Sequence, residues 1–108
     1  MPDDYRIRKV LEFLERDPAK SVPELASLVN LSSSRLGHLF KIQMGVDLGH
    51  FLANERLEKA AELLRRTELS IKQIAATVGY HHSSSLDRGF QNKFGVAPAD
   101  FRRKCRER

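Results

Sequence analysis

The side chains best suited to chemistry gather in the segment YHHSSSLDRGF, residues 80–90, which holds two histidines, three serines, an aspartate and an arginine. A histidine pair can bind a transition metal, but no C-x-x-C or H-x-x-x-H pattern accompanies His81 and His82 to complete a ligand set. Cys105 has no evident base partner, and neither a glycine-rich phosphate loop nor a constellation of paired carboxylates is visible. We therefore expect no metal, no cofactor and no enzymatic activity. A serine-rich linker and a contact surface remain as interpretations of this segment.

Within this segment, Arg88 has the chemistry most specific to a nucleic acid, because a guanidinium can donate two hydrogen bonds to guanine O6 and N7. A good pair of this kind discriminates against the wrong base by about 1–3 kcal/mol. Just beyond it, Gln91 can bond adenine or a phosphate, and the short serines bond bases or phosphates with little selectivity. Asp87 would repel phosphate, so it either accepts from a cytosine amino group or holds Arg88 in place.

The charge distribution also favours a polyanionic partner. The chain of 108 residues has a net charge of +5 and an isoelectric point of about 9.7. Residues 86–108 hold seven basic and three acidic side chains, which is +4 of that total. A solvated basic tail that aids solubility is the alternative explanation, and charge by itself does not separate the two.

The composition excludes several classes of protein. Apolar residues make up 41% and charged residues 31% of the chain, which argues for a folded domain rather than disorder. No apolar run approaches the roughly 18 residues that a membrane span needs. The N-terminal segment MPDDYRIRKV lacks the apolar region of a signal peptide, and one cysteine cannot form an internal disulfide. We expect a cytoplasmic protein with no membrane partner.

Helical spacing runs along the chain, without a useful stretch of period-two alternation. Residues 21–24 and 70–73 each match the capping box S-x-x-E/Q, which marks a helix start. Gly45 is a helix stop, and Asp47 can cap the long uninterrupted segment that follows it. The sequence thus predicts an all-α fold of about seven helices in one domain, residues 1–108. A first helix is predicted from the i, i+3, i+4, i+7 spacing of Ile7, Val10, Leu11 and Leu14.

An internal repeat is the strongest feature of the chain. SVPELASLV at 21–29 aligns with SIKQIAATV at 70–78, SSRLGHLF at 33–40 with SSSLDRGF at 83–90, and GVDLGHF at 45–51 with GVAPADF at 95–101. The offset changes from 49 to 50 after the first pair of segments, so the second turn holds one extra residue. Each unit is a short capped helix, a tight turn and a second helix, which describes a helix-turn-helix. We place the units at about 21–45 and 70–95, joined by a linker helix at about 48–66. An ordinary helical hairpin is the alternative.

In each unit the second helix has an apolar side and a polar reverse. At about 100° per residue, Leu36 and Phe40 share one side of the first, and Leu86 and Phe90 share one side of the second. Such a helix can pack on a core while its polar side enters the DNA major groove, where its first turn meets the bases. The candidate DNA-binding residues are Ser34, Arg35, Gly37, His38 and Lys41 in the first unit and Ser83, Ser84, Ser85, Asp87, Arg88 and Gln91 in the second.

The chain resembles the DNA-binding domain of the AraC/XylS family of transcription regulators over roughly residues 5–105. The resemblance is carried by LSSSRLGHLFKIQMG, by NERLEKAAELLRRTELSIKQIAATVGY and by SSSLDRGFQNKFGVAPADFRR. The family signature has an Arg-Leu pair and an alanine in the central helix, then I-A-x-x-x-G-aromatic, and finally G-x-x-P-x-x-aromatic-R. Those positions are Arg56-Leu57, Ala60, Ile74-Ala75, Gly79-Tyr80, Gly95, Pro98 and Phe101-Arg102 here.

The resemblance implies two helix-turn-helix units joined by the long central helix, double-stranded DNA as a partner, and contact with RNA polymerase. It implies a transcription regulator, with activation as the expected role and with an effector domain, where there is one, outside this chain. The base-contacting positions would be Ser34, Gly37 and His38 in the first unit and Ser83, Ser84, Ser85 and Arg88 in the second. The chain departs from the family at Gly37, where a longer polar side chain is common. We therefore expect the first unit to read bases weakly and to depend on phosphates through Arg35 and Lys41.

The length of the linker helix predicts how the two units are used. Its 19 residues would span about 28 Å, compared with about 34–36 Å for one turn of DNA. A spacer of this length can hold two reading helices in successive major-groove segments. We expect one copy of the chain to cover a direct, asymmetric site and to be nucleoid-associated when bound. The alternative is a helical protein-interaction module whose basic end docks an acidic partner without reading DNA.

Overall fold

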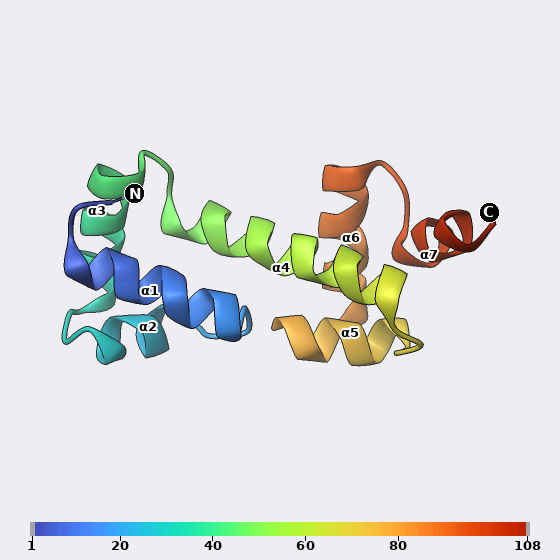
Figure 1. Ribbon diagram of the computed structural model, residues 1–108, viewed down its shortest axis with the longest axis horizontal. Coiled ribbons are helices and arrows are strands. Elements are labelled where there is room, and N and C mark those ends of the chain that lie inside the picture. The colour runs from blue at the N-terminus through green and yellow to red at the C-terminus, as the bar shows by residue number, and fades with distance from the viewer. Residues whose placement is uncertain (1, 108) are drawn as a thin grey trace. The chain divides into compact units, whose positions relative to one another are not determined.

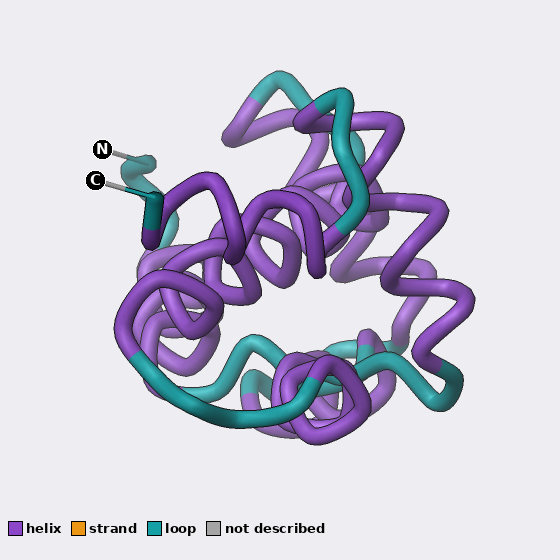
Figure 2. Tube along the Cα trace, turned by 90° about the vertical axis from the view of Figure 1, so that its right-hand side faces the viewer, coloured by secondary structure: helices purple, strands orange, loops and turns teal. Residues whose placement is uncertain are grey.

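The computed structural model describes residues 2–107, which form seven α-helices and no strand (Figure 1). The helices are α1 (Tyr5–Arg16), α2 (Val22–Leu28), α3 (Ser33–Met44), α4 (Leu48–Arg66), α5 (Ile71–Val78), α6 (Ser83–Phe94) and α7 (Pro98–Arg106). Short loops join them (Figure 2). The predicted all-α fold of about seven helices is confirmed. Within the described range, no helix has the length and apolar character that crossing a membrane requires.

The first of two compact units runs to Asn54 and packs α1, α2, α3 and the first part of α4 around one core. Its fully buried side chains include Ile7 of α1, Leu25 of α2, and Leu36 and Phe40 of α3. The Phe40 ring meets the ring of Phe51 on α4 edge to face, with centroids 5.2 Å apart. Because Leu36 and Phe40 are the side of α3 that enters this core, they decide which side chains of α3 face solvent.

The second unit, from Glu55 onward, uses the rest of α4 with α5, α6 and α7. Ile74 of α5 and Leu86 and Phe90 of α6 are fully buried there. Phe90 meets Phe101 of α7 edge to face at 5.3 Å, which is the counterpart of the aromatic pair in the first unit. The two cores therefore orient α3 and α6 by the same means.

The duplication extends beyond the segments that align clearly in sequence. At an offset of 50, the buried residues Ile7, Val10 and Leu14 of α1 correspond to the buried residues Leu57, Ala60 and Leu64 of α4. An ion pair recurs at the same offset, between Lys9 and Glu12 at 3.7 Å and between Lys59 and Glu62 at 3.4 Å. Each repeat is thus a four-helix unit, and α4 is the last helix of the first and the first helix of the second. Sequence comparison missed this part because substitutions such as valine to alanine conceal it.

The predicted helix boundaries have visible causes. Both capping boxes form: the serine Oγ accepts the backbone N–H of Glu24 at 3.3 Å and of Gln73 at 3.0 Å, and each of these side chains bonds back. Asp47 accepts the N–H of His50 at 3.3 Å in the first turn of α4. Gly45 ends α3 with a φ of 77°, a left-handed conformation that glycine adopts without strain.

The two turns leave their first helices in the same way. Asn30 and Gly79 adopt left-handed φ values of 59° and 106°. In each turn the next residue donates its N–H to the carbonyl five residues back, at 2.9 and 2.8 Å. From there the first turn reaches α3 through Ser32, whereas the second reaches α6 through His81 and His82. The extra residue predicted for the second turn is therefore present, as His81.

Candidate nucleic-acid interface

The start of α3 is held by Ser32, whose Oγ accepts the backbone N–H of Arg35 at 3.1 Å. All five predicted residues of this unit lie on α3. Gly37 is partly exposed, and Ser34, Arg35, His38 and Lys41 are exposed. This unit therefore presents a polar side to solvent, with two cations and one histidine on it.

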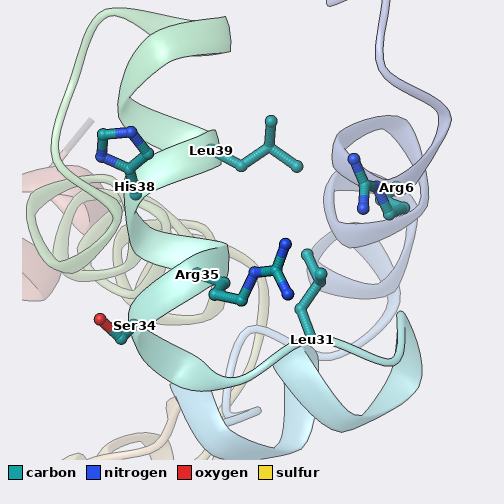
Figure 3. Close-up of a pocket in the computed structure, with 6 residues that line it drawn as sticks. All are labelled: Arg6, Leu31, Ser34, Arg35, His38 and Leu39. Atoms are coloured by element: carbon teal, nitrogen blue, oxygen red, sulfur yellow. The ribbon is translucent and has the colours of Figure 1, made fainter.

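Figure 3 shows that these α3 side chains point in two directions. Ser34 and His38 project from one side of α3, whereas Arg35 and Leu39 project from the other side, toward α1. All four side chains line one hollow together with Leu31 and with Arg6 of α1, and Arg35 extends toward the α1 side of it. Arg35 therefore does not share the direction of Ser34 and His38, which agrees with a phosphate role for Arg35 more than with base reading.

The predicted residues of the second unit all lie on α6. Ser83, Ser84, Ser85, Arg88 and Gln91 are exposed, and Asp87 is partly exposed. The described residues offer Arg88 no hydrogen bond or ion pair, so Asp87 does not hold it in place. The guanidinium of Arg88 is available for a partner, and its counterpart at the same helical position in the first unit is His38.

The helix starts differ between the two units. His82 occupies the N-cap position of α6, and its side chain makes no capping hydrogen bond, unlike that of Ser32 before α3. Backbone N–H groups at a helix start attract anions. Lys72 of α5 and the side chains of His81 and His82 line a surface hollow beside Ser83 and Ser84. This end of α6 is therefore suited to a phosphate.

Gly89 of α6 faces Leu57 of α4 and Tyr80 of the turn. A Cβ placed on Gly89 would lie 3.5 Å from Cδ2 of Leu57 and 3.5 Å from the hydroxyl of Tyr80. Burial raises the pKa of the Tyr80 hydroxyl, and the charge of Arg56 opposes that shift. Tyr80 thus packs against α6 at Gly89, a residue with no side chain.

Several basic side chains of the C-terminal segment bind other groups of the second unit. Arg102 donates to the carbonyls of Leu64, Leu69 and Thr67 at 3.1, 2.6 and 3.1 Å, so it caps the end of α4 and holds the following loop. Arg106 bonds the carbonyl of Thr67 at 2.9 Å and pairs with Glu68. That contact lowers the pKa of the Glu68 carboxyl.

Two further basic residues of this segment pair with acids. Arg103 lies between Asp100 at 3.1 Å and Glu107 at 3.8 Å, and Lys93 pairs with Glu58 at 3.4 Å. Much of the excess positive charge of residues 86–108 is therefore neutralised locally. Sequence reasoning did not include Arg6 or Lys72 among the candidate residues. Arg6 recurs as Arg56 at an offset of 50, and this recurrence could have shown that α1 belongs to the repeat.

Metal-binding side chains do not form a cluster in the part of the chain that the structure describes. No group of three or more histidine, cysteine or acidic side chains is placed to hold a metal ion among residues 2–107. His81 lies in the turn and His82 at the helix start. Cys105 is an exposed free thiol on α7.

Comparisons with known proteins agree with this architecture. A family model described as a helix-turn-helix domain matches residues 25–104. The arabinose operon regulatory protein of Escherichia coli K12 is 32% identical over 110 residues, which cover 99% of this chain and 38% of that protein. An uncharacterized HTH-type transcriptional regulator, YfiF of Bacillus subtilis, is 41% identical over 81 residues, 73% of this chain and 25% of the relative. The chain thus spans well under half the length of these curated relatives.

Solved structures show the same fold. The C-terminal domain of AraT, a response regulator from Geobacillus stearothermophilus, superposes with a TM-score of 0.83 at 31% identity, covering 94% of this chain and 86% of that one. The DNA-binding domain of AdpA, a global transcriptional factor solved with a target DNA, has a TM-score of 0.84 at 22% identity, with 95% of each chain covered.

The fold and these matches define a protein with two helix-turn-helix units. The chain belongs to the AraC/XylS family of transcription regulators and carries the family's helix-turn-helix domain.

Proposed function

We propose that this chain is a sequence-specific, double-stranded DNA-binding module that regulates transcription, with α3 and α6 as its two reading helices. One observation carries the proposal: two equivalent helices each bury a leucine and a phenylalanine and leave a polar reverse side exposed. That pairing is what a helix needs to pack on its domain and enter a major groove. The similarity in fold to a domain solved with target DNA supports it.

The second unit supplies the main base contacts in this proposal. Arg88 donates two hydrogen bonds to a guanine, and Ser83, Ser84 and Ser85 place hydroxyls in the first turn of α6. Gln91, one turn beyond Arg88, bonds adenine or a phosphate. Asp87 has no hydrogen-bond or ion-pair partner among residues 2–107 and accepts from a cytosine amino group.

The first unit contributes fewer base contacts. In this proposal His38 and Ser34 face a base edge. Each can make fewer hydrogen bonds to a base than an arginine can, and Gly37 has no side chain to make one. Arg35 and Lys41 bind phosphates and set the register of the domain on the duplex. This unit positions the protein on DNA more than it selects the sequence.

The length of α4 bears on how much DNA one copy of the chain can contact. This helix has 19 residues, about 28 Å at 1.5 Å per residue, against about 34–36 Å for one DNA turn. We propose that one copy reads two successive major-groove segments of an asymmetric site. Family membership supports activation through RNA polymerase, a cytoplasmic, nucleoid-associated location, an effector domain outside this chain, and the absence of enzymatic activity.

A binding titration tests the proposal. The chain is titrated against a duplex obtained by selection from random sequence and against a random duplex of equal length, at two salt concentrations. We expect tighter binding to the selected duplex, and affinity for both duplexes that falls steeply with salt, since phosphate contacts release counterions. A protein-interaction module without DNA reading would give no enriched sequence and no salt-dependent duplex binding.

A further inference from the structure

The first unit has a hollow in which Ser34, Arg35 and His38 of the proposed reading helix meet Arg6 of α1. It measures about 420 Å³ and lies between α1, the turn and α3 (Figure 3). Leu31 and Leu39 supply an apolar wall, and Arg6 and Arg35 bring two guanidinium groups to it. We propose that this hollow binds a small amphipathic carboxylate, with the carboxylate between the two arginines and the apolar body against the two leucines.

The charges around the hollow favour an anion. The residues that line it include no carboxylate, and Arg35 has no ion pair in the described part of the chain. One edge of the Arg6 guanidinium donates to the carboxylate of Asp4, from Nε at 3.2 Å and from Nη2 at 3.0 Å. This contact orients the guanidinium and leaves Nη1 for a ligand. Two guanidinium groups recognise a carboxylate with directed, charge-assisted hydrogen bonds.

The size and the apolar wall favour an organic acid over a bare anion. Small-molecule sites usually occupy about 300–1,000 Å³ and combine an apolar lining with a few convergent polar groups. Leu31 and Leu39 are both only half-buried, so their free surface is available to an apolar ligand. Burying that surface would add to the affinity that the two arginines provide.

The second unit lacks the same features at the equivalent place and is an internal control. Tyr80 stands where the first unit has Leu31, Gly89 where it has Leu39, and Ser85 where it has Arg35. The Tyr80 hydroxyl reaches to 3.5 Å from the Cβ position of Gly89, so the ring covers the space that two leucines leave open. One of the two cations is also absent. The second unit should therefore not bind the carboxylate.

A ligand in the hollow would affect DNA binding through Arg35. This step rests on the proposed function, because it assumes that Arg35 binds a phosphate of the duplex. A carboxylate that holds the Arg35 guanidinium toward α1 removes that contact and its counterion release. Ligand and DNA should then weaken each other by the same factor.

The test uses the full chain without DNA and follows amide chemical shifts during titration with hexanoate, 1-hexanol and inorganic phosphate. We expect hexanoate to shift the amides of Leu31, Arg35 and Leu39 and to leave those of Tyr80, Ser85 and Gly89 unchanged. In this hollow, hexanol and phosphate should each bind at least tenfold more weakly than hexanoate, as measured by the amides of Leu31, Arg35 and Leu39. Arg6→Gln should weaken hexanoate binding at least tenfold, whereas Arg56→Gln at the equivalent position should not change it.

Equal affinity of this hollow for hexanol or phosphate, equal shifts by hexanoate in the two units, or unchanged hexanoate binding in Arg6→Gln would each overturn the proposed site. A second titration, of hexanoate into a complex with the selected duplex, tests the coupling. We expect hexanoate to release DNA from the parent chain and not from Arg6→Gln. Failure to bind any duplex would overturn the DNA proposal, whereas the titration without DNA would still decide whether the hollow binds the carboxylate.

Discussion

The two helix-turn-helix units have equivalent cores and differ on their surfaces. Phe40 with Phe51 and Phe90 with Phe101 form equivalent edge-to-face pairs at 5.2 and 5.3 Å. The exposed large apolar side chains found among residues 2–107 all belong to the first unit, and they are Tyr5, Leu28, Ile42 and Val46. The equivalent positions of the second unit hold Glu55, Thr77, Asn92 and the partly buried Val96. Duplicated cores have kept the reading helices oriented while their surfaces diverged.

Truncation of the buried aromatic anchor should give the largest effect. Phe90→Ala and Phe40→Ala are each expected to lower the free energy of unfolding by about 3–5 kcal/mol, because a fully buried ring is lost and a cavity remains. Denaturant titration followed by amide signals of each unit measures it. Each substitution should destabilise its own unit more. Equal loss in both units from either variant would show that the cores do not act separately.

Arg102 marks the next difference, because the first unit has the buried Leu52 at the equivalent position. Arg102→Met removes three hydrogen bonds from a charged donor and should lower the stability of the second unit by about 1.5–3 kcal/mol. Arg103→Met, which breaks only exposed ion pairs, is the matched control and should cost less than about 1 kcal/mol. Thermal unfolding of both variants measures the two losses. Equal losses would argue against a stabilising role for the three hydrogen bonds of Arg102.

Sequence reasoning reached most of the fold because its signals are local. Capping boxes, Gly45 and the leucine–phenylalanine spacing act within one or two turns, and each one is visible in the structure. The use of Arg102 could not be predicted, since its three acceptors lie 33–38 residues away along the chain. The hollow beside Arg6 was missed for the same reason. Whether an exposed arginine such as Arg88 meets a base depends on a partner that the chain alone does not contain.

The helix starts offer a smaller contrast between the units. Ser32→Ala removes the side-chain cap of α3 and should cost about 1 kcal/mol in the first unit. His82→Ser introduces a cap before α6 and should stabilise the second unit by a similar amount, since its side chain makes no capping bond now. Amide hydrogen exchange in the two helices measures both changes. A gain of stability from Ser32→Ala, or a loss from His82→Ser, would contradict the assigned roles of the two N-cap side chains.

Acidification should separate the two capping boxes, with the smallest effect. Hydrogen bonds from the backbone and side chain of Ser21 hold the pKa of Glu24 below its ordinary value. The stability that these bonds contribute is therefore fully present above the ordinary pKa and is lost as the pH falls through the folded pKa. Gln73 in the second box does not titrate. The amide proton shift of Ser21 should therefore move as the pH falls below the ordinary glutamate pKa of 4.5, whereas that of Ser70 stays constant. Glu24→Gln should abolish the movement, and its persistence in that variant would assign it to another group.

We propose that α6 reads bases and that α3 reads them more weakly. The direct test is the affinity of Arg88→Ala and His38→Ala for the selected duplex and for a random duplex of equal length at one salt concentration. Arg88→Ala should lose about 1–3 kcal/mol on the selected duplex, roughly 5- to 150-fold, and far less on the random one. His38→Ala should show the same pattern with a smaller loss. An equal loss on both duplexes for Arg88→Ala would make it a phosphate contact and contradict the claim.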